Sequence, residues 1–252
     1  MSAMLDTVET EGRMARPDGE WVAWKKLQGV GPTLVWLNGY RSDMEGTKAV
    51  ALAQWARAQG RGLVRFDYLG HGASTGDFIA KGCIGRWRDD AITVIDWMTS
   101  GPVVLVGSSM GGWLACLAAL ARPERIAGLV LVAPAADFTD KLVEPGLDAP
   151  ARAALKADGV YFNGDTPYTQ LMLEDGARWP ILPGPVPINC PIRILQGAKD
   201  EDVPWTHALK LHQAVTASDS VFTLIKDGDH RLSRPQDLER LITTVAEIAP
   251  RN

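Results

Sequence analysis

The sequence has few cysteines, no excess of positive charge and no long apolar run. Its three cysteines, Cys83, Cys116 and Cys190, stand at unrelated spacings, which argues against a disulfide framework and against a zinc site. The formal net charge of −4 supplies no basic surface for a phosphate backbone, so we expect no nucleic-acid partner. We also expect no membrane span, because the longest apolar runs have only the length of a strand.

The N-terminal stretch, MSAMLDTVETEGRMARPDGEWVAWKK, lacks the apolar centre of a secretion signal and carries acidic residues from position 6. Neither a secretion signal nor a transit peptide has this pattern, so we expect a cytoplasmic protein. With 46% hydrophobic and 22% charged residues, the chain suits one globular domain over residues 1–252.

Strand-like and helix-like segments alternate along most of the chain, after an N-terminal hairpin with RPDGE as its turn. The continuous Val, Ile and Leu runs are typical of strands that are covered on both faces. They predict an α/β fold with a mostly parallel central sheet flanked by helices. The predicted strands are 33–37, 62–67, 102–107, 126–134, 191–197 and 220–225, and the predicted helices are 45–60, 85–98, 110–121, 205–215 and 235–249.

The alternation stops between residues 135 and 189, where prolines, glycines and weakly amphipathic pieces predominate. This composition predicts a cap or lid inserted over one edge of the sheet. Two interpretations of its apolar residues are equally open, the lining of an acyl pocket and the packing of the cap onto the sheet. These residues are Val160, Tyr161, Phe162, Leu171, Met172, Trp179, Ile181 and Leu182.

The pattern G-x-S-x-G occurs twice, as GASTG at 72–76 and as GSSMG at 107–111. Its physical meaning is a strand that turns at once into a helix and thereby exposes a serine in a strained backbone conformation. The second copy directly follows the apolar run VVLV and directly precedes an apolar helix, so we predict that Ser109 is a nucleophile. The first copy lies in a polar loop, and we expect Ser74 to belong to a tight turn supported by Asp67.

A serine nucleophile needs a base, and the chain has four histidines. In the strand-turn-helix arrangement the partners follow the serine in the order acid, then histidine, which excludes His71. His207 and His212 are predicted to be ordinary residues of a helix. His230, in the loop KDGDHRLS between the last strand and the last helix, is the predicted base.

The acid is predicted at the carboxyl end of an intervening strand, in ILQGAKDEDVP. Asp200 is our choice, with the role of holding the imidazole tautomer and stabilising the imidazolium. The neighbouring Glu201 and Asp202 stay open as alternatives, and so does Asp137, which follows the strand LVLVA.

The tetrahedral oxyanion requires two backbone donors. We predict the N–H of Met110, at the start of the helix, and the N–H of Tyr40, in the loop WLNGYRS after the first central strand. This chemistry needs no cofactor and no metal ion.

Several motifs lie between Trp36 and His230: LNGYRSDMEGTKA, RFDYLGHGASTG, GRWRDD, VGSSMGGWLA, ARPERI, NCPIRILQGAKDEDVPW and DH. Together they resemble the alpha/beta-hydrolase-fold serine hydrolases, and among these the palmitoyl-protein thioesterases and acyl-glucuronide esterases of the alpha/beta-hydrolase-domain group. The resemblance implies a triad on Ser109, Asp200 and His230. These thioesterases are mitochondrial, but the lack of a presequence pattern in this chain predicts a cytoplasmic location.

The expected function is therefore hydrolysis of carboxylic esters or thioesters, of small molecules or of acylated proteins, through an acyl-enzyme. Carbon-carbon hydrolases and perhydrolases use the same triad and are the alternative enzymes. A small-molecule receptor that retains the triad is the alternative from another class.

Overall fold

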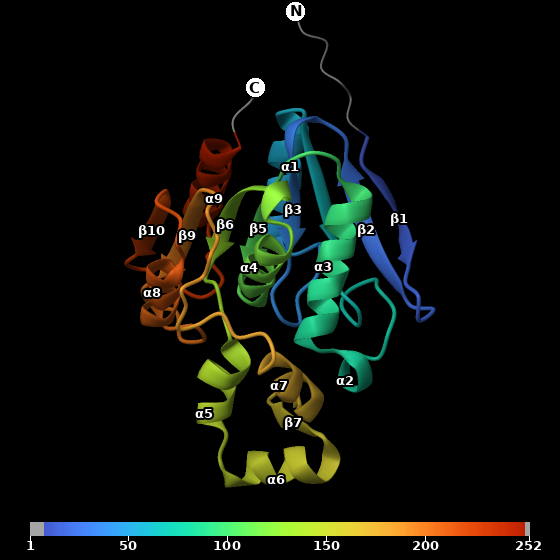
Figure 1. The fold of residues 1–252 in the computed structure, drawn as a ribbon, viewed down its shortest axis with the longest axis vertical. Helices are drawn as coiled ribbons and strands as arrows, with labels where there is room; N and C mark the ends of the chain where they lie inside the picture. The colour runs from blue at the N-terminus through green and yellow to red at the C-terminus, as the bar shows by residue number, and fades with distance from the viewer. Residues whose placement is uncertain (1–7, 250–252) are drawn as a thin grey trace, which may run out of the picture.

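The apolar runs of the sequence form one eight-stranded sheet in the computed structural model, which describes residues 8–249 (Figure 1). Its strand order is β1-β2-β4-β3-β5-β6-β9-β10. β2 pairs antiparallel with β1 and with β4, and the other neighbours are parallel, which confirms the predicted α/β fold. The strands are β1 (Thr10–Ala15), β2 (Trp21–Leu27), β3 (Val30–Leu37), β4 (Arg61–Phe66), β5 (Val103–Ser108), β6 (Ile126–Val132), β9 (Ile192–Gly197) and β10 (Ser220–Ile225).

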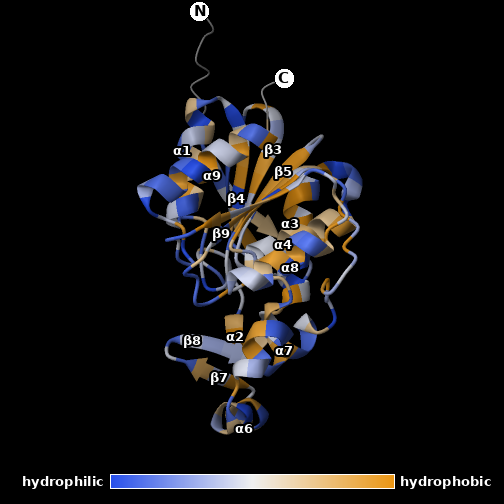
Figure 2. Cartoon of the chain, turned by 90° about the vertical axis from the view of Figure 1, so that its left-hand side faces the viewer, coloured by the Kyte–Doolittle hydropathy of each residue, from blue (hydrophilic) through white to orange (hydrophobic). Residues whose placement is uncertain are grey.

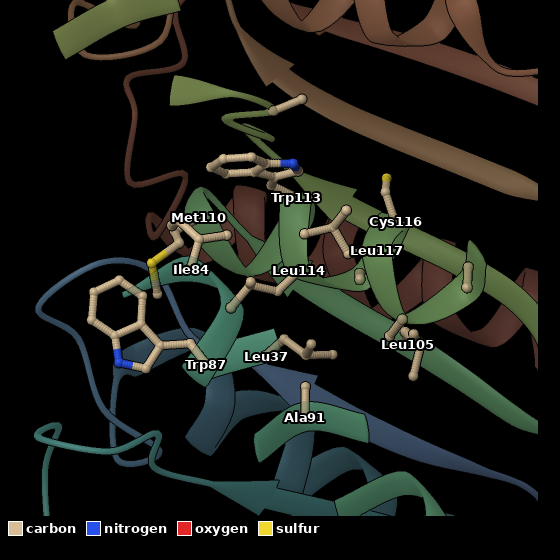
Figure 3. Close-up of a cluster of buried hydrophobic side chains, with 14 of the residues drawn as sticks. Leu37, Ile84, Trp87, Ala91, Leu105, Met110, Trp113, Leu114, Cys116 and Leu117 are labelled. Atoms are coloured by element: carbon tan, nitrogen blue, oxygen red, sulfur yellow. The ribbon is translucent and has the colours of Figure 1, made fainter. Parts of the chain in front are cut away.

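Helices cover both faces of the sheet because its central strands are apolar on both sides (Figure 2). On one face α1 (Thr47–Ala58) and α9 (Pro235–Ile248) bury side chains such as Leu52 and Leu241. On the other face lie α3 (Ile84–Met98), α4 (Met110–Ala121) and α8 (Trp205–Ala214). Figure 3 shows the cluster that α3 and α4 build there, with Trp87 and Trp113 fully buried.

The segment between β6 and β9 leaves the sheet and lies beyond the end of the sheet at which β6 stops (Figure 1). It contains a two-stranded antiparallel hairpin and several short helices, and its interpretation as a cap stays a prediction. Its elements are the π-helix η2 (Thr139–Val143), α5 (Glu144–Gly146), α6 (Ala149–Asp158), β7 (Val160–Asn163), β8 (Thr166–Thr169) and α7 (Gln170–Gly176).

Two short helices elsewhere in the chain were not predicted from the sequence. A 3-10 turn, η1 (Pro123–Arg125), precedes β6. A four-residue helix, α2 (Phe78–Lys81), begins soon after GASTG, where we expected only a loop. Asp77 starts α2, because its carboxylate accepts the N–H groups of Ile79 and Ala80.

The sequence led us to expect neither a targeting peptide at the N-terminus nor a membrane span. The stretch considered for a targeting peptide begins with residues 1–7, which lie outside the described residues. Within residues 8–249, no helix is both long enough and apolar enough to cross a membrane.

Candidate active site

Ser109 stands alone between the last residue of β5 and the first residue of α4. Its backbone has φ 54° and ψ −119°, a conformation that residues other than glycine rarely adopt. The turn is tight because α4 starts directly against the end of β3: a Cβ atom on Gly111 would lie 2.1 Å from the carbonyl oxygen of Leu37. The strand, turn and helix expected at this serine are therefore all present.

A chain of hydrogen bonds runs from Ser109 through His230 to Asp200. The Nε2 atom of His230 lies 3.2 Å from the Oγ of Ser109, and its Nδ1 lies 2.8 Å from the Oδ2 of Asp200. Because the carboxylate can only accept a hydrogen bond, Nδ1 of the neutral ring carries the hydrogen, and Nε2 is left bare and able to accept the hydroxyl proton. The structure thus brings together the three residues selected from the sequence.

The carboxylate of Asp200 is fully buried and is surrounded by donors. Its Oδ1 accepts the N–H groups of Asp202 and Val203 at 3.0 and 2.7 Å. Its Oδ2 accepts the side-chain amide of Gln196 at 2.9 Å, besides His230. These donors stabilise the ionised carboxylate. Gln196 was missed in the sequence, although a polar residue in the apolar run PIRILQG was the signal.

The three residues left open as alternatives to Asp200 lie in other surroundings. Asp137 is buried, and its carboxylate accepts the N–H groups of Ile181 and Leu182 at 2.8 to 3.1 Å. Burial raises the pKa of this carboxyl group. Glu201 and Asp202 are exposed, and Asp202 contributes its backbone N–H to Asp200.

The remaining histidines lie outside this hydrogen-bond chain. His207 on α8 bonds the carbonyl oxygen of Ala136 through Nε2 at 2.7 Å, and burial lowers the pKa of its imidazole. His212 on the same helix contacts the hydroxyl of Ser220 through Nδ1 at 2.9 Å. His71 is buried beside the loop that follows β3.

A cluster of possible metal ligands coincides with this site. Ligand atoms of Asp200, Asp202 and His230 lie within 4.8 Å of one another. However, both carboxylate oxygens of Asp200 and the Nδ1 of His230 already take part in the bonds described above. The donor set therefore fits a proton-transfer chain better than a metal site.

The two residues predicted to supply the oxyanion donors line the same cavity as the serine. Met110 is the first residue of α4, and the first N–H groups of a helix have no partner within it. The loop after β3 passes close by: a Cβ on Gly39 would lie 3.3 Å from the Cβ and 4.0 Å from the Oγ of Ser109. Tyr40 follows Gly39 and lines the same cavity as Ser109 and Met110.

This cavity, of about 510 Å³, opens between Ser109, His230 and the segment after β6. Of the apolar residues proposed from the sequence, Tyr161 lines it, whereas Met172 is buried in the core and Phe162 is half exposed. Most of its apolar wall was missed, because it comes from η2 and its neighbours rather than from the later part of the segment. The missed residues there are Phe138, Leu142, Val143 and Leu147, and Tyr168 of β8 was missed as well.

A second hollow, of about 440 Å³, meets the first at Ser109 and His230. It extends toward the start of α1, where Thr47 and Lys48 line it. Lys48 also donates to the carbonyl oxygen of Arg231, the residue after His230. Burial lowers the pKa of the Lys48 ammonium group to about 8.

The chain is similar to known proteins over most of its length. Residues 32–163 match the family described as serine aminopeptidase, S33. The human palmitoyl-protein thioesterase ABHD10, mitochondrial, is 36% identical over 239 residues, which are 92% of this chain and 78% of the human protein.

Two solved structures agree with this similarity. A putative hydrolase from Agrobacterium vitis S4 is 39% identical and matches with a TM-score of 0.90, over 96% of this chain and 99% of its own. The mouse alpha/beta hydrolase domain-containing protein 10 is 32% identical and matches with a TM-score of 0.88, over 95% and 98% of the two chains.

The cytoplasmic location expected from the N-terminal stretch is wrong by this comparison. The human protein and four further mammalian relatives, at 35 to 36% identity, are all named as mitochondrial. The composition of the N-terminal stretch was therefore a poor guide to the compartment.

Proposed function

Because the chain belongs to the alpha/beta-hydrolase family of serine ester and thioester hydrolases, we propose that it cleaves acyl esters or thioesters through an acyl-enzyme on Ser109. The observation that carries the proposal is the chain of bonds from Ser109 to His230 (3.2 Å) and from His230 to Asp200 (2.8 Å). The strained backbone at Ser109 supports it.

In the first half of the reaction, His230 takes the hydroxyl proton of Ser109 at Nε2 while Oγ attacks the acyl carbonyl carbon. Asp200 stabilises the imidazolium that forms. The tetrahedral intermediate then breaks its bond to the leaving sulfur or oxygen, which receives the proton from His230. In the second half, water gives a proton to His230 and attacks the acyl-enzyme. His230 then returns this proton to the Oγ of Ser109 as the bond between Oγ and the acyl carbon breaks, and the free acid is released.

The oxyanion forms between the two amides that we assign to the hole, those of Met110 and Tyr40. Two observations support this assignment. Met110 begins a helix, whose partial positive charge favours an anion, and Gly39 places the preceding loop against the Ser109 side chain.

We assign the acyl group to the cavity of about 510 Å³, whose volume lies in the range of small-molecule sites. Its wall of Phe138, Leu142, Val143 and Leu147 suits an alkyl chain. The mammalian relatives are palmitoyl-protein thioesterases by name, so we propose long-chain thioesters, of proteins or of small thiols, as the substrate class. The segment 135–189 is then the cap over the acyl chain.

Turnover of a graded series of acyl thioesters and p-nitrophenyl esters tests the proposal. Ser109→Ala should lower kcat by a factor on the order of 10⁶ without unfolding the protein, because no other group replaces the nucleophile. Ser74→Ala, in the other G-x-S-x-G, is the matched control and should not silence the enzyme. Undiminished turnover by Ser109→Ala would refute the triad, and an optimum at short acyl chains would refute the assigned substrate class.

A further inference from the structure

The loop after β3 makes a turn that is strained at the residue after Tyr40. The N–H of Ser42 donates to the carbonyl oxygen of Gly39 at 3.1 Å, so Tyr40 and Arg41 are the two central residues. Arg41 has φ 60°, in the left-handed region that glycine favours at the third position of a turn. Such a conformation persists only where the surroundings hold it.

His71 provides the hydrogen-bond acceptor that holds this residue. The backbone N–H of Arg41 donates to Nε2 of His71 at 3.3 Å. The other ring nitrogen, Nδ1, lies 3.1 Å from the carbonyl oxygen of Leu69, which is only an acceptor. Nδ1 must therefore carry the proton, and Nε2 must be bare.

The surroundings of His71 keep its ring neutral and fixed. The side chain is 3% exposed, and burial lowers the pKa of its imidazole to about 4. Its ring packs against Phe78 and Trp87, with centroids 5.1 and 5.2 Å away. The ring of Tyr40 packs on the same two residues, at 5.4 and 5.8 Å.

Tyr40 is thus fixed on two sides of its Cα atom. The aromatic cluster holds its side chain, and His71 holds the peptide that joins it to Arg41. The third substituent is the backbone N–H, which we assign to the proposed oxyanion hole. We propose that His71 is a positioning residue that aims the Tyr40 amide at the oxyanion. This role of His71 rests on the proposed function.

The segment that carries His71 holds the loop at a second point. The carboxylate of Asp67 accepts the N–H of Met44 at 2.7 Å with one oxygen and the N–H of Ala73 at 2.9 Å with the other. Gly72 packs directly against this carboxylate, since a Cβ atom on Gly72 would lie 2.1 Å from Asp67 Oδ2. Ser74 donates to the backbone oxygen of Asp67 at 2.6 Å. The segment GASTG, at residues 72–76, is therefore part of the turn that supports the loop after β3 through Asp67.

Two substitutions of His71 separate positioning from packing. His71→Phe keeps an aromatic ring among Phe78 and Trp87 but removes the acceptor, and should lower kcat about tenfold to a hundredfold with little change in KM. His71→Gln offers a carbonyl oxygen to Arg41 and should recover most of that loss. His212→Phe makes the same replacement on α8, at a histidine that contacts Ser220 rather than the loop after β3, and as the control it should keep kcat. Wild-type kcat in His71→Phe, or an equal loss in both His71 variants, would overturn the proposal.

A measurement on the unaltered protein covers the case in which His71→Phe does not fold. In ¹⁵N-histidine spectra, His71 should show a protonated Nδ1 and a bare Nε2 and should stay neutral at about pH 5.5, where a free imidazole is mostly charged. A proton on Nε2 under these conditions would exclude its acceptance of the Arg41 N–H and overturn the proposal.

The outcomes distinguish this role from the underlying reaction. If Ser109→Ala is inactive while His71→Phe keeps its kcat, only the role of His71 fails. If Ser109→Ala stays active, the proposed function fails, whatever the spectrum of His71 shows.

Discussion

The burial of His71 has a consequence for stability as well as for the loop it holds. In the unfolded chain its imidazole titrates near the ordinary value of 6.5, and in the folded protein its pKa is lowered to about 4. Between these values the unfolded chain binds a proton that the folded protein does not bind. The stabilising contribution is therefore fully present above about pH 6.5 and is lost as the pH falls toward 4.

We expect His71 alone to remove about 3 kcal/mol from the free energy of unfolding over this range. His71→Gln has no titrating side chain, so its free energy of unfolding should decline less with acid. Urea unfolding of both proteins near pH 7 and near pH 4.5 measures the difference. Parallel declines would show that His71 is not the buried neutral group described here.

At the scale of the elements, the serine turn depends on how closely α4 approaches the end of β3. Gly111 lies at this contact, with the carbonyl oxygens of Leu37 and Asn38 at 2.1 and 2.5 Å from a Cβ placed on it. These are backbone atoms, so neither moves away without displacing the strand that leads into the oxyanion loop.

Gly111→Ala should therefore destabilise the protein by about 3 kcal/mol, through overpacking. Gly146→Ala is the matched control, because a Cβ there meets nothing within 4 Å. Thermal unfolding of the two variants should show a large loss for the first and almost none for the second. A melting temperature of Gly111→Ala equal to that of the wild type would contradict the tight approach.

The elements also show what can be predicted from sequence. α4 and β10 begin and end where predicted, because a mainly apolar segment with clear flanking signals defines each. β7, β8 and α2 have four residues each, too few for a hydrophobic period to appear. The short strands carry Tyr161 and Tyr168 of the cavity wall, so this wall was only partly predictable.

The candidate triad was easier to select than the groups that position it. Ser109, Asp200 and His230 lie at sequence positions fixed by strand ends and chain order, and their catalytic roles stay predictions. The role proposed for His71 depends on the backbone N–H of Arg41, and such a partner leaves no side-chain signature in the sequence.

Tyr40 connects the loop after β3 to the segment between β6 and β9. Its hydroxyl donates to the carbonyl oxygen of Pro167 in β8, and its ring stacks on Tyr168 at 5.9 Å with an interplanar angle of 7°. One residue thus contributes its backbone to the proposed oxyanion hole and its side chain to the hairpin over the cavity.

Tyr40→Phe keeps the ring and the amide but removes the bond to Pro167. Because one neutral hydrogen bond contributes about 1 kcal/mol, KM for long acyl chains should rise about fivefold. The kcat on short esters should stay unchanged, and amide hydrogen exchange in residues 160–169 should become faster. Equal effects on short and long substrates would contradict a link through the cap.

The two hollows that meet at Ser109 suit the order in which products would leave the proposed acyl-enzyme. If the acyl chain occupies the hollow beneath the cap, the thiol or alcohol lies in the one toward α1 and diffuses away while the acyl chain is still covalently held. Water enters through the space just vacated. Under the proposed mechanism the leaving group and the water use the same side of Ser109, and the free acid departs last.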